Sequence, residues 1–392
     1  MYPPYQRPLV WNGPYGFDPS YIARPQSTSR PPEWPVYPSQ TVIPDTTAPH
    51  PSVQRLPAFN RGTDYKEATD DPSRPSDKKT LGVYRYRAAW DIDESKHSGW
   101  KHIQLDSDEE PSRHMREHPR VKLVSWNIDF ESNWPCDRAT ALIDYLQKVI
   151  CQCPETTSRP RVPCVIMLQE VHSKVLRDVI HKHDWIRNNF MLTPIDHDKW
   201  PLSWMHGCIT LVERTVCVRD AYTINYAWSD QRRMAIGIEI GLWNASGVRR
   251  NMILLNTHLE DDIDEPVHHR HRKRQLNECR LQLIRKGFGG VLCASMSRFD
   301  GYDDLDDAYV YDKLGFVDAA GYENDEKSDT WGYQGGRGAE KCRPDKMLVL
   351  SPPQRNRKLL LARPKRIGVG LTFKDNRFVS DHFGLCATLE VE

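Results

Sequence analysis

The chain has 392 residues, and its 54 Lys and Arg against 53 Asp and Glu give a formal net charge of +1. This balance excludes a uniformly basic protein that binds polyanions through net charge alone, and the length allows one large domain or two ordinary ones. The start has no basic stretch followed by an apolar one, and no apolar run reaches the ~18 residues of a membrane helix. We therefore expect an intracellular protein, nuclear or cytoplasmic, without a signal peptide, transmembrane helix or membrane contact, and a monomer. The ten Cys lack a paired CxxC framework, which is typical of free thiols in a reducing compartment.

Residues 1–118 are expected to form a disordered, Pro-rich and charged tail or linker. More than half of the 29 Pro lie before residue 120, and the opening "MYPPYQRPLVWNGPYGF" has neither a helical nor a strand period. A solvated tail is one interpretation, and a tail whose Tyr and Trp dock a protein partner is the other. The segment "HIQLDSDEEPSR" (102–113) is read in the same two ways, as a solvated linker or as an extended partner-binding stretch with Ser107 as a phosphorylation site.

The composition changes at Val121, and a single domain is predicted over residues 119–392. Buried or alternating apolar runs predict strands, and apolar residues at helical spacing predict helices. The predicted strands, in chain order, are 121–130, 161–171, 207–227 (a hairpin), 234–243, 251–261, 290–297, 345–352 and 383–391, and the predicted helices are 138–150, 173–186 and 267–287. Strands alternating with helices and hairpins indicate an α/β protein in which helices cover the sheets.

Four of the predicted strands end in, or follow, a polar cluster. These clusters are Asn127-Ile128-Asp129, Gln169-Glu170, Asn256-Thr257-His258 and Ser380-Asp381-His382. Sites are commonly built where strands end at one rim of a sheet, and carboxylate and amide oxygens suit Mg²⁺. Each cluster alone has an ordinary structural explanation: Glu170 would belong to a capped turn, and His258 would be a core histidine. Their joint occurrence predicts a site.

The motifs "WNID", "LQEV", "NTHLE" and "SDHFGL" stand in the order found in the endonuclease/exonuclease/phosphatase superfamily. Within it, "SWNID", "RKRQL", "DTWGYQ" and "CRPDKML" make residues 121–392 resemble most the 5′-tyrosyl-DNA phosphodiesterase branch. The resemblance implies a four-layer α/β/β/α sandwich of the DNase I-like type. It also implies a phosphodiesterase dependent on Mg²⁺, with Mn²⁺ as the alternative, that acts on DNA or phosphotyrosyl-DNA.

The resemblance assigns roles to the metal site. Asn127 and Glu170 would hold the metal, with Glu170 as its main anionic ligand, and Asp381 would support the metal or its waters. His382 would stabilise the phosphoryl oxygens as charge develops there. Asp345 would hold His382 in the required tautomer.

The resemblance also assigns residues that face the substrate. Asn256 and His258 would contact the scissile phosphate or the leaving group. Arg233 would face a phosphate or a phosphotyrosyl ring, since a guanidinium binds both. Trp331 matches an aromatic residue near the site, although a core position explains it equally well.

One motif departs from the family. Where the family has Gly-Asp-x-Asn, this chain has Ala294-Ser295-Met296-Ser297. The Asp of the family would orient or activate the attacking water and the Asn would hold the phosphate, so Ser295 and Ser297 occupy catalytic positions with unsuitable groups. A serine hydroxyl does not accept a proton near neutral pH, and loss of a general base slows a reaction by about 10²–10⁴. An acid from the loop after Ser297 could replace it, but a solvated acidic loop is the simpler interpretation.

The basic run "HHRHRKR" (268–274) opens the predicted helix 267–287. It would face nucleic-acid phosphates, or it would be an exposed helix start balanced by "EDDIDE" just before it, or its histidines would bind a transition metal.

Three functions remain open from the sequence. The first is a Mg²⁺-dependent phosphodiesterase of the DNA-repair type, slowed by Ser295 and Ser297. The second is a catalytically impaired descendant that binds nucleic acid or a protein partner. The third is a phosphatase or phosphodiesterase acting on a small molecule or a lipid head group, since one fold hosts several substrates.

Overall fold

The computed structural model describes residues 76–87, 99–105, 119–151, 161–201, 205–260, 266–296, 307–321, 326–334, 341–352 and 359–392. All of the described residues belong to one compact unit, Asp70–Glu392.

One sheet has seven strands in the order β1-β8-β9-β10-β11-β13-β12. The pairs are antiparallel except β10–β11, which is parallel. The strands are β1 (Asp77–Thr80), β8 (Cys217–Asn225), β9 (Met234–Trp243), β10 (Arg249–His258), β11 (Gly290–Ser295), β12 (Val317–Asp318) and β13 (Asp345–Leu350). The parallel pairing brings the ends of β10 and β11 to the same rim, so His258 lies opposite Ser295.

The second sheet has nine strands. Eight follow the order β14-β16-β4-β5-β7-β6-β2-β3, and β15 pairs with β16 beside this path. The strands are β2 (Val83–Tyr86), β3 (Trp100–Ile103), β4 (Arg120–Asn127), β5 (Cys164–His172), β6 (Phe190–Thr193), β7 (His206–Glu213), β14 (Leu359–Leu361), β15 (Lys365–Ile367) and β16 (Gly384–Val391). Its central pair, β4 and β5, is parallel and sets Asn127 opposite Gln169.

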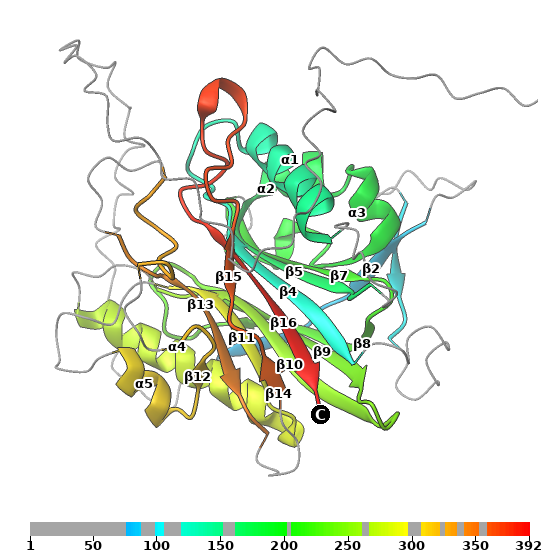
Figure 1. Cartoon of the computed structure of the whole chain (residues 1–392), viewed down its shortest axis with the longest axis vertical. Coiled ribbons are helices and arrows are strands. Elements are labelled where there is room, and N and C mark those ends of the chain that lie inside the picture. The colour runs from blue at the N-terminus through cyan, green and yellow to red at the C-terminus, as the bar shows by residue number, and fades with distance from the viewer. Residues whose placement is uncertain are drawn as a thin grey trace, which may run out of the picture. The chain divides into compact units, whose positions relative to one another are not determined.

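Helices cover the outer face of each sheet (Figure 1). Those on the nine-stranded sheet are α1 (Pro135–Tyr145), α2 (Ser173–Val175) and α3 (Asp184–Asn189), with π-helical turns at Leu146–Cys151 and Leu176–Ile180. Those on the seven-stranded sheet are α4 (Pro266–Ile284) and α5 (Asp307–Lys313), and short 3₁₀ turns occupy His197–Lys199, Arg285–Gly287 and Lys374–Asn376. The predicted α/β/β/α sandwich is therefore confirmed.

Burial on both faces of the central strands explains this layering. All ten residues of β9 are buried, as are all six of β11 and of β13. One large cluster of buried apolar residues joins the two sheets and the helices α1–α3, and a second lies between the seven-stranded sheet and α4 and α5. Strands buried on both faces show continuous apolar runs instead of alternation, which is why these runs are visible in the sequence.

The sheets begin earlier in the chain than the predicted boundary at residue 119. Strands β1, β2 and β3 come from the stretch predicted as tail, and only Leu81 and Gly82 separate β1, in one sheet, from β2, in the other. We call residues 76–87 the strap. Leu81 and Val83 are buried at 4% and 1% exposure, so the strap is part of the folded domain. The prediction of a wholly disordered segment 1–118 is wrong for these residues, because a four-residue edge strand leaves too little pattern to read.

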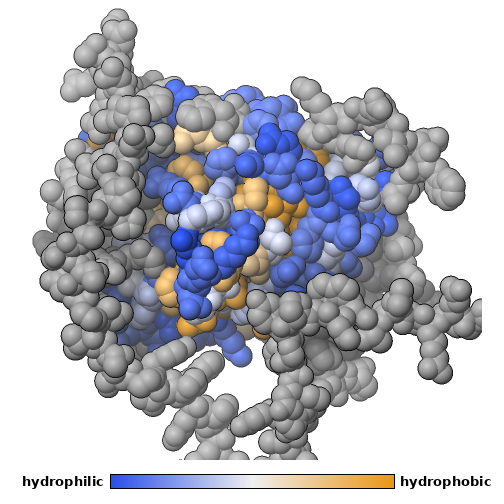
Figure 2. All heavy atoms as spheres, turned by 90° about the horizontal axis from the view of Figure 1, so that it is seen from above, coloured by the Kyte–Doolittle hydropathy of each residue, from blue (hydrophilic) through white to orange (hydrophobic). Residues whose placement is uncertain are grey.

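A space-filling view from above shows a mostly hydrophilic described surface, with hydrophobic residues gathered near the middle of that face (Figure 2). Within the described ranges, no helix has both the length and the apolar character needed to cross a membrane.

Candidate active site

The polar strand ends meet in a cleft of about 520 Å³ that both sheets line. Its lining includes most of the residues singled out from the sequence: Asn127, Glu170, Arg233, His258, Ser295, Trp331, Asp381 and His382. The cleft lies where β4, β10 and β11 end, where β5 bulges and where β16 is about to begin. A volume of this size suits a bound small molecule or a few groups of a polymer.

Glu170 is aimed into the cleft by an irregular turn of its own strand. The register between β5 and β7 shifts between Leu168 and Val171, and Glu170 has a φ of 55°, in the left-handed region. Such a conformation is uncommon for a residue other than glycine, and a bulge re-aims a side chain next to a site. The carboxylate accepts hydrogen bonds from Asn127 Nδ2 (2.9 Å) and from the Phe130 backbone N–H (3.2 Å).

Two carboxylates in the cleft are suited to hold a cation. Desolvation raises the pKa of Glu170 despite the hydrogen bond from Asn127, and desolvation also raises the pKa of Asp381. Asp381 Oδ2 accepts a hydrogen bond from Trp331 Nε1 (2.9 Å), whereas Oδ1 is buried with no hydrogen-bond partner among the described residues. Buried carboxylates that lack compensation are costly, and a dication would supply it. The oxygens of Glu170, Asp381 and Asn127 therefore fit Mg²⁺.

His382 and Asp345 form a buried charged pair at the side of the cleft. His382 Nδ1 lies 2.8 Å from Asp345 Oδ2, and Thr330 Oγ1 donates to the same oxygen at 2.6 Å. Burial alone would lower the pKa of His382, but the charge and hydrogen bond of Asp345, with Asp381 and Glu170 nearby, outweigh it and raise the pKa to about 10. These interactions favour the protonated ring, with Nδ1–H donating to Asp345.

Arg233 and His258 form the opposite pair. Arg233 NH1 lies 2.7 Å from His258 Nδ1, and because a guanidinium only donates, Nδ1 must accept and the imidazole is neutral. Burial first, and then the charge of Arg233, lower the pKa of His258 well below its usual value. Glu170 Oε1 is 3.4 Å from the same Nδ1, but with Nδ1 unprotonated this contact is not an ion pair.

Ser295 lies at the floor of the cleft and is 1% exposed. It is the last residue of β11, opposite Asp345 in β13, and its Oγ accepts a hydrogen bond from Asn127 Nδ2 (3.2 Å). The uncharged hydroxyl therefore lies between the Glu170–Asn127 side of the site and the His382–Asp345 pair. Ser297, and the acids of the loop that follows it, lie outside the described residues.

Asn256 is not among the residues that line the cleft. Its Nδ2 donates to Ile209 O (2.7 Å), and its Oδ1 accepts from Gln169 Nε2 (2.8 Å). Asn256 is 1% exposed, so its amide joins the two sheets in the interior instead of facing a substrate. The resemblance implied that Asn256 contacts the phosphate, and its buried position does not agree with this. A residue at a strand end can point to either face of the sheet, and the sequence alone does not tell which.

Three further groups of the site had no role assigned to them from the sequence. His206, at the start of β7, lines the cleft, and burial together with the charge of Arg233 lowers its pKa to about 3. Asp129 lines it too, and is paired with the buried Arg138 (3.3 Å). Thr330 orients Asp345 through a hydrogen bond. In the sequence it was visible only as a member of the motif "DTWGYQ", directly before Trp331.

The charge of the cleft defines what it can bind. Its described lining has four carboxylates, one arginine and the protonated His382, and the carboxylates are Asp129, Glu131, Glu170 and Asp381. Without a cation this excess of acids repels a phosphate, whereas a dication removes it. The arrangement suits metal-assisted chemistry on a phosphate ester, with cationic side chains at two sides.

Comparison with solved structures finds a similar fold in two structures of TDP2. A D. rerio TDP2 humanized by 14 mutations is 17% identical with a TM-score of 0.50, and D. rerio TDP2 complexed with single strand DNA product is 16% identical with a TM-score of 0.50. Each match covers 69% of this chain and 99% of that one. A truncated Caenorhabditis elegans TDP2 is 20% identical with a TM-score of 0.47, over 69% of this chain and 97% of that one. No family model and no curated protein matches the sequence.

Proposed function

We propose that this protein is a Mg²⁺-dependent phosphodiesterase of the 5′-tyrosyl-DNA type that turns over slowly. The observation that carries the proposal is the meeting, in one cleft, of a cation-suited carboxylate pair with the charged pair His382–Asp345 and the pair Arg233–His258. Each pair has an ordinary structural explanation alone, but a folded chain does not bury three such polar pairs at one rim without a compensating use.

The roles of the side chains follow from their protonation states. Bound Mg²⁺ would act as a Lewis acid on the phosphoryl oxygens and lower the pKa of its waters. His382, fixed by Asp345 and cationic at neutral pH, would donate from Nε2 to a non-bridging oxygen as charge develops there. Arg233 would bind a second oxygen or the leaving group, and neutral His258 would hold the guanidinium in place.

Ser295 is the reason to expect a low rate. The hydroxyl sits where the resemblance expects a carboxylate, and it is occupied by the hydrogen bond from Asn127. Without a base at this position the attacking water must lose its proton to solvent or to a weaker group, which slows such reactions by about 10²–10⁴.

Nucleic acid is the substrate class that this arrangement favours. One structure of the same fold is that of D. rerio TDP2 complexed with single strand DNA product. A polymer with several phosphates also suits a cleft whose cationic side chains, Arg233 and His382, lie at two sides. Mn²⁺ would replace Mg²⁺ at the same oxygens.

The test uses the full-length chain with Mg²⁺ and a 5′-phosphotyrosyl oligonucleotide. We expect slow release of the 5′-phosphate end by the unaltered chain and none by Glu170→Gln prepared in the same way. The double variant Ser295→Asp/Ser297→Asn should be faster by about 10²-fold or more, because it restores the acid and the amide. Ser295→Ala is the matched control, and it should leave the low rate nearly unchanged.

The same experiment decides for or against a non-catalytic protein, the second candidate, which Ser295 specifically favours. An unaltered chain without turnover that still binds the oligonucleotide, with activity only in the double variant, would establish that candidate. Equal rates for the unaltered chain and Glu170→Gln would contradict a metal-dependent reaction. Inositol phosphates and sphingomyelin are the comparison substrates, and preference for either would replace DNA with a small molecule or lipid head group.

A further inference from the structure

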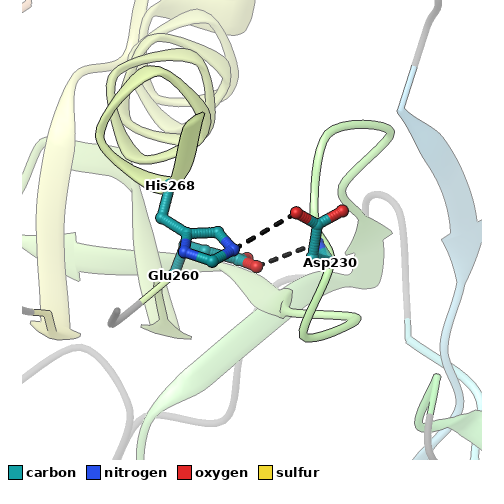
Figure 3. A group of neighbouring side chains, drawn as sticks. All are labelled: Asp230, Glu260 and His268. Atoms are coloured by element: carbon teal, nitrogen blue, oxygen red, sulfur yellow. Dashed lines mark hydrogen bonds and ion pairs between the residues drawn. The ribbon is translucent and has the colours of Figure 1, made fainter. Parts of the chain in front are cut away.

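A second group of ionisable side chains lies outside the lining of the cleft, where the loop between β8 and β9 meets the start of α4. Asp230 extends from the loop, Glu260 follows β10 and His268 lies in the first turn of α4 (Figure 3). One ligand atom of each residue lies within 4.8 Å of the others. None of the three lines the cleft, although Gln231 and Arg233, farther along the same loop, do.

The spacing of these atoms suits a small dication. His268 Nε2 is 3.2 Å from Asp230 Oδ2, and His271 Nδ1 is 3.8 Å from the same oxygen. A tetrahedral ion with ligands at about 2.1 Å holds its ligand atoms about 3.4 Å apart. Side-chain rotations would have to close the group to this spacing, most of all at His271, which is not among the three residues whose ligand atoms lie within 4.8 Å of one another.

His271 provides an independent sign of a missing ligand. It is 6% exposed, and its Nδ1 is buried with no hydrogen-bond partner among the described residues. His268 and His271 are three residues apart on a helix, which puts them on one face of α4 above Asp230. A buried imidazole nitrogen without a partner calls for an explanation, and a bound ion supplies one.

Glu260 is already held in place. Its Oε1 accepts from the backbone N–H groups of Asp230 and Gln231 (both 2.8 Å), and its Oε2 accepts from Ser229 Oγ (2.7 Å) and Gln275 Nε2 (3.1 Å). Among these four donors the Ser229 hydroxyl is the one that can rotate away. An ion would therefore bind Glu260 at Oε2 in its place, while the other three donors keep the carboxylate fixed.

We infer that Asp230, Glu260, His268 and His271 form a binding site for a transition-metal dication, of which Zn²⁺ is the best fit. Two imidazole nitrogens with two carboxylate oxygens favour Zn²⁺, Co²⁺ or Ni²⁺ over Mg²⁺, which prefers oxygen and keeps its waters. This site differs from the oxygen-lined cleft in its donors and in its metal, although one loop contributes residues to both.

An ion at this site would fix the loop that carries Arg233. The Arg233 backbone N–H donates to Ser229 Oγ (2.6 Å), and its Nε donates to Gln231 Oε1 (2.9 Å), so residues 229–233 move together. Tying Asp230 to α4 would restrict this loop and thereby the guanidinium that contacts His258. The role would be structural, two steps away from the reacting atoms.

The test measures the metal alone on the full-length chain after removal of bound ions with a chelator. We expect one equivalent of Zn²⁺ to bind with a Kd of about 1 µM or tighter, and Co²⁺ to give the intense visible absorption of a four-coordinate ion. Asp230→Asn and His268→Gln should each weaken binding about 30-fold or more and remove the Co²⁺ band. Asp230 is exposed, so its substitution keeps the fold even if that of His268 does not.

Two controls separate this site from others. Glu170→Gln removes the carboxylate of the cleft and should keep the Co²⁺ band. His269→Gln changes the neighbouring histidine, which helical spacing turns about 100° from His268, and should bind Zn²⁺ as the unaltered chain does. Binding that survives Asp230→Asn and His268→Gln, or that is lost in Glu170→Gln, would overturn the inference, as would a Kd weaker than about 100 µM.

Discussion

Glu170 is a carboxylate that the metal-free protein holds at a cost. Its pKa is raised chiefly by desolvation, so its contribution favours folding below the unfolded value near 4.5 and is lost as the pH rises through the folded value. At neutral pH the buried charge therefore destabilises the metal-free chain. The same charge makes Glu170 suitable as a metal ligand, because next to a bound dication the negative charge stabilises the folded protein instead of destabilising it.

Glu170→Gln, which keeps the shape and removes the charge, should therefore raise the stability of the metal-free protein at pH 7. We expect a gain of about 1 kcal/mol, or roughly 2–4 °C in Tm, that disappears as the pH falls towards 4. Thermal unfolding with and without Mg²⁺ measures both the gain in the metal-free variant and the stabilisation by the ion. Mg²⁺ should raise the Tm of the unaltered chain and leave that of the variant unchanged. An equal Mg²⁺ effect on both proteins would mean that the ion binds elsewhere.

At the scale of elements, the strap links the two sheets, with β1 at the edge of one and β2 next to the edge strand β3 of the other. Leu81 N donates to Ala221 O (2.8 Å) beside one sheet, and Thr193 Oγ1 donates to Gly82 O (3.0 Å) beside the other. Gly82 has no room for a side chain, since a Cβ would lie 2.7 Å from the Tyr84 ring and 2.8 Å from that of His102. The strap and β3 thus complete the fold from a part of the chain that precedes its recognisable motifs.

A chain that starts at residue 119 should be markedly less stable than one that starts at residue 76. The shorter chain loses the burial of Leu81, Val83 and Trp100, each worth about 1.5–3 kcal/mol, whereas the longer one keeps every described contact. Thermal or urea unfolding of both chains, beside the full-length protein, measures the difference. If the two truncated chains unfold at the same temperature, the strap does not stabilise the domain.

The sequence predicted the long buried strands and α4 well, and the short elements poorly. Strand β5 has five apolar residues in a row (Cys164–Leu168) and β10 has four (Met252–Leu255), each run followed by polar residues, so their pattern is local. By contrast β1, "DKKT", and β3, "WKHI", exist because of pairing with distant strands, which no local pattern encodes. The predicted helix 173–186 is broken into α2, a π-helical turn and α3 for the same reason: its packing is set by the sheet beneath it.

The candidate site was predictable in its members and less so in their orientation. Strand-end motifs brought Asn127, Glu170 and His382 to one cleft, because the parallel strands β4 and β5 end at the rim where the antiparallel strand β16 begins. The sequence did not reveal which face Asn256 takes, nor that His206 enters from the start of a strand. Both depend on how the two sheets stack, which is a property of the whole domain.

The whole molecule depends on that stacking, since the cleft has walls from both sheets. Asn256 of β10 lies at the join: it accepts from Gln169 of β5 and donates to Ile209 O of β7. Buried amides that satisfy groups on a facing sheet fix the relative position of the two layers, provided that each group is paired. We therefore assign Asn256 to the alignment of the two walls and not to contact with a substrate.

Asn256→Ala should destabilise the protein by about 2–4 kcal/mol, because it removes the hydrogen bond that Asn256 donates to Ile209 O and one of those that Gln169 Nε2 donates, and opens a small cavity. Asn251→Ala is the matched control in the same strand, where the amide is half-exposed and its contact with Glu239 is long (3.5 Å), and it should cost less than about 1 kcal/mol. Urea unfolding gives both values, and cleavage of the phosphotyrosyl oligonucleotide per folded molecule should stay within a few-fold of the unaltered chain. A loss of cleavage above 100-fold with little loss of stability would instead mean that Asn256 contacts the substrate. The two sheets would then close around the phosphate more tightly than the hydrogen bonds of their buried amides indicate.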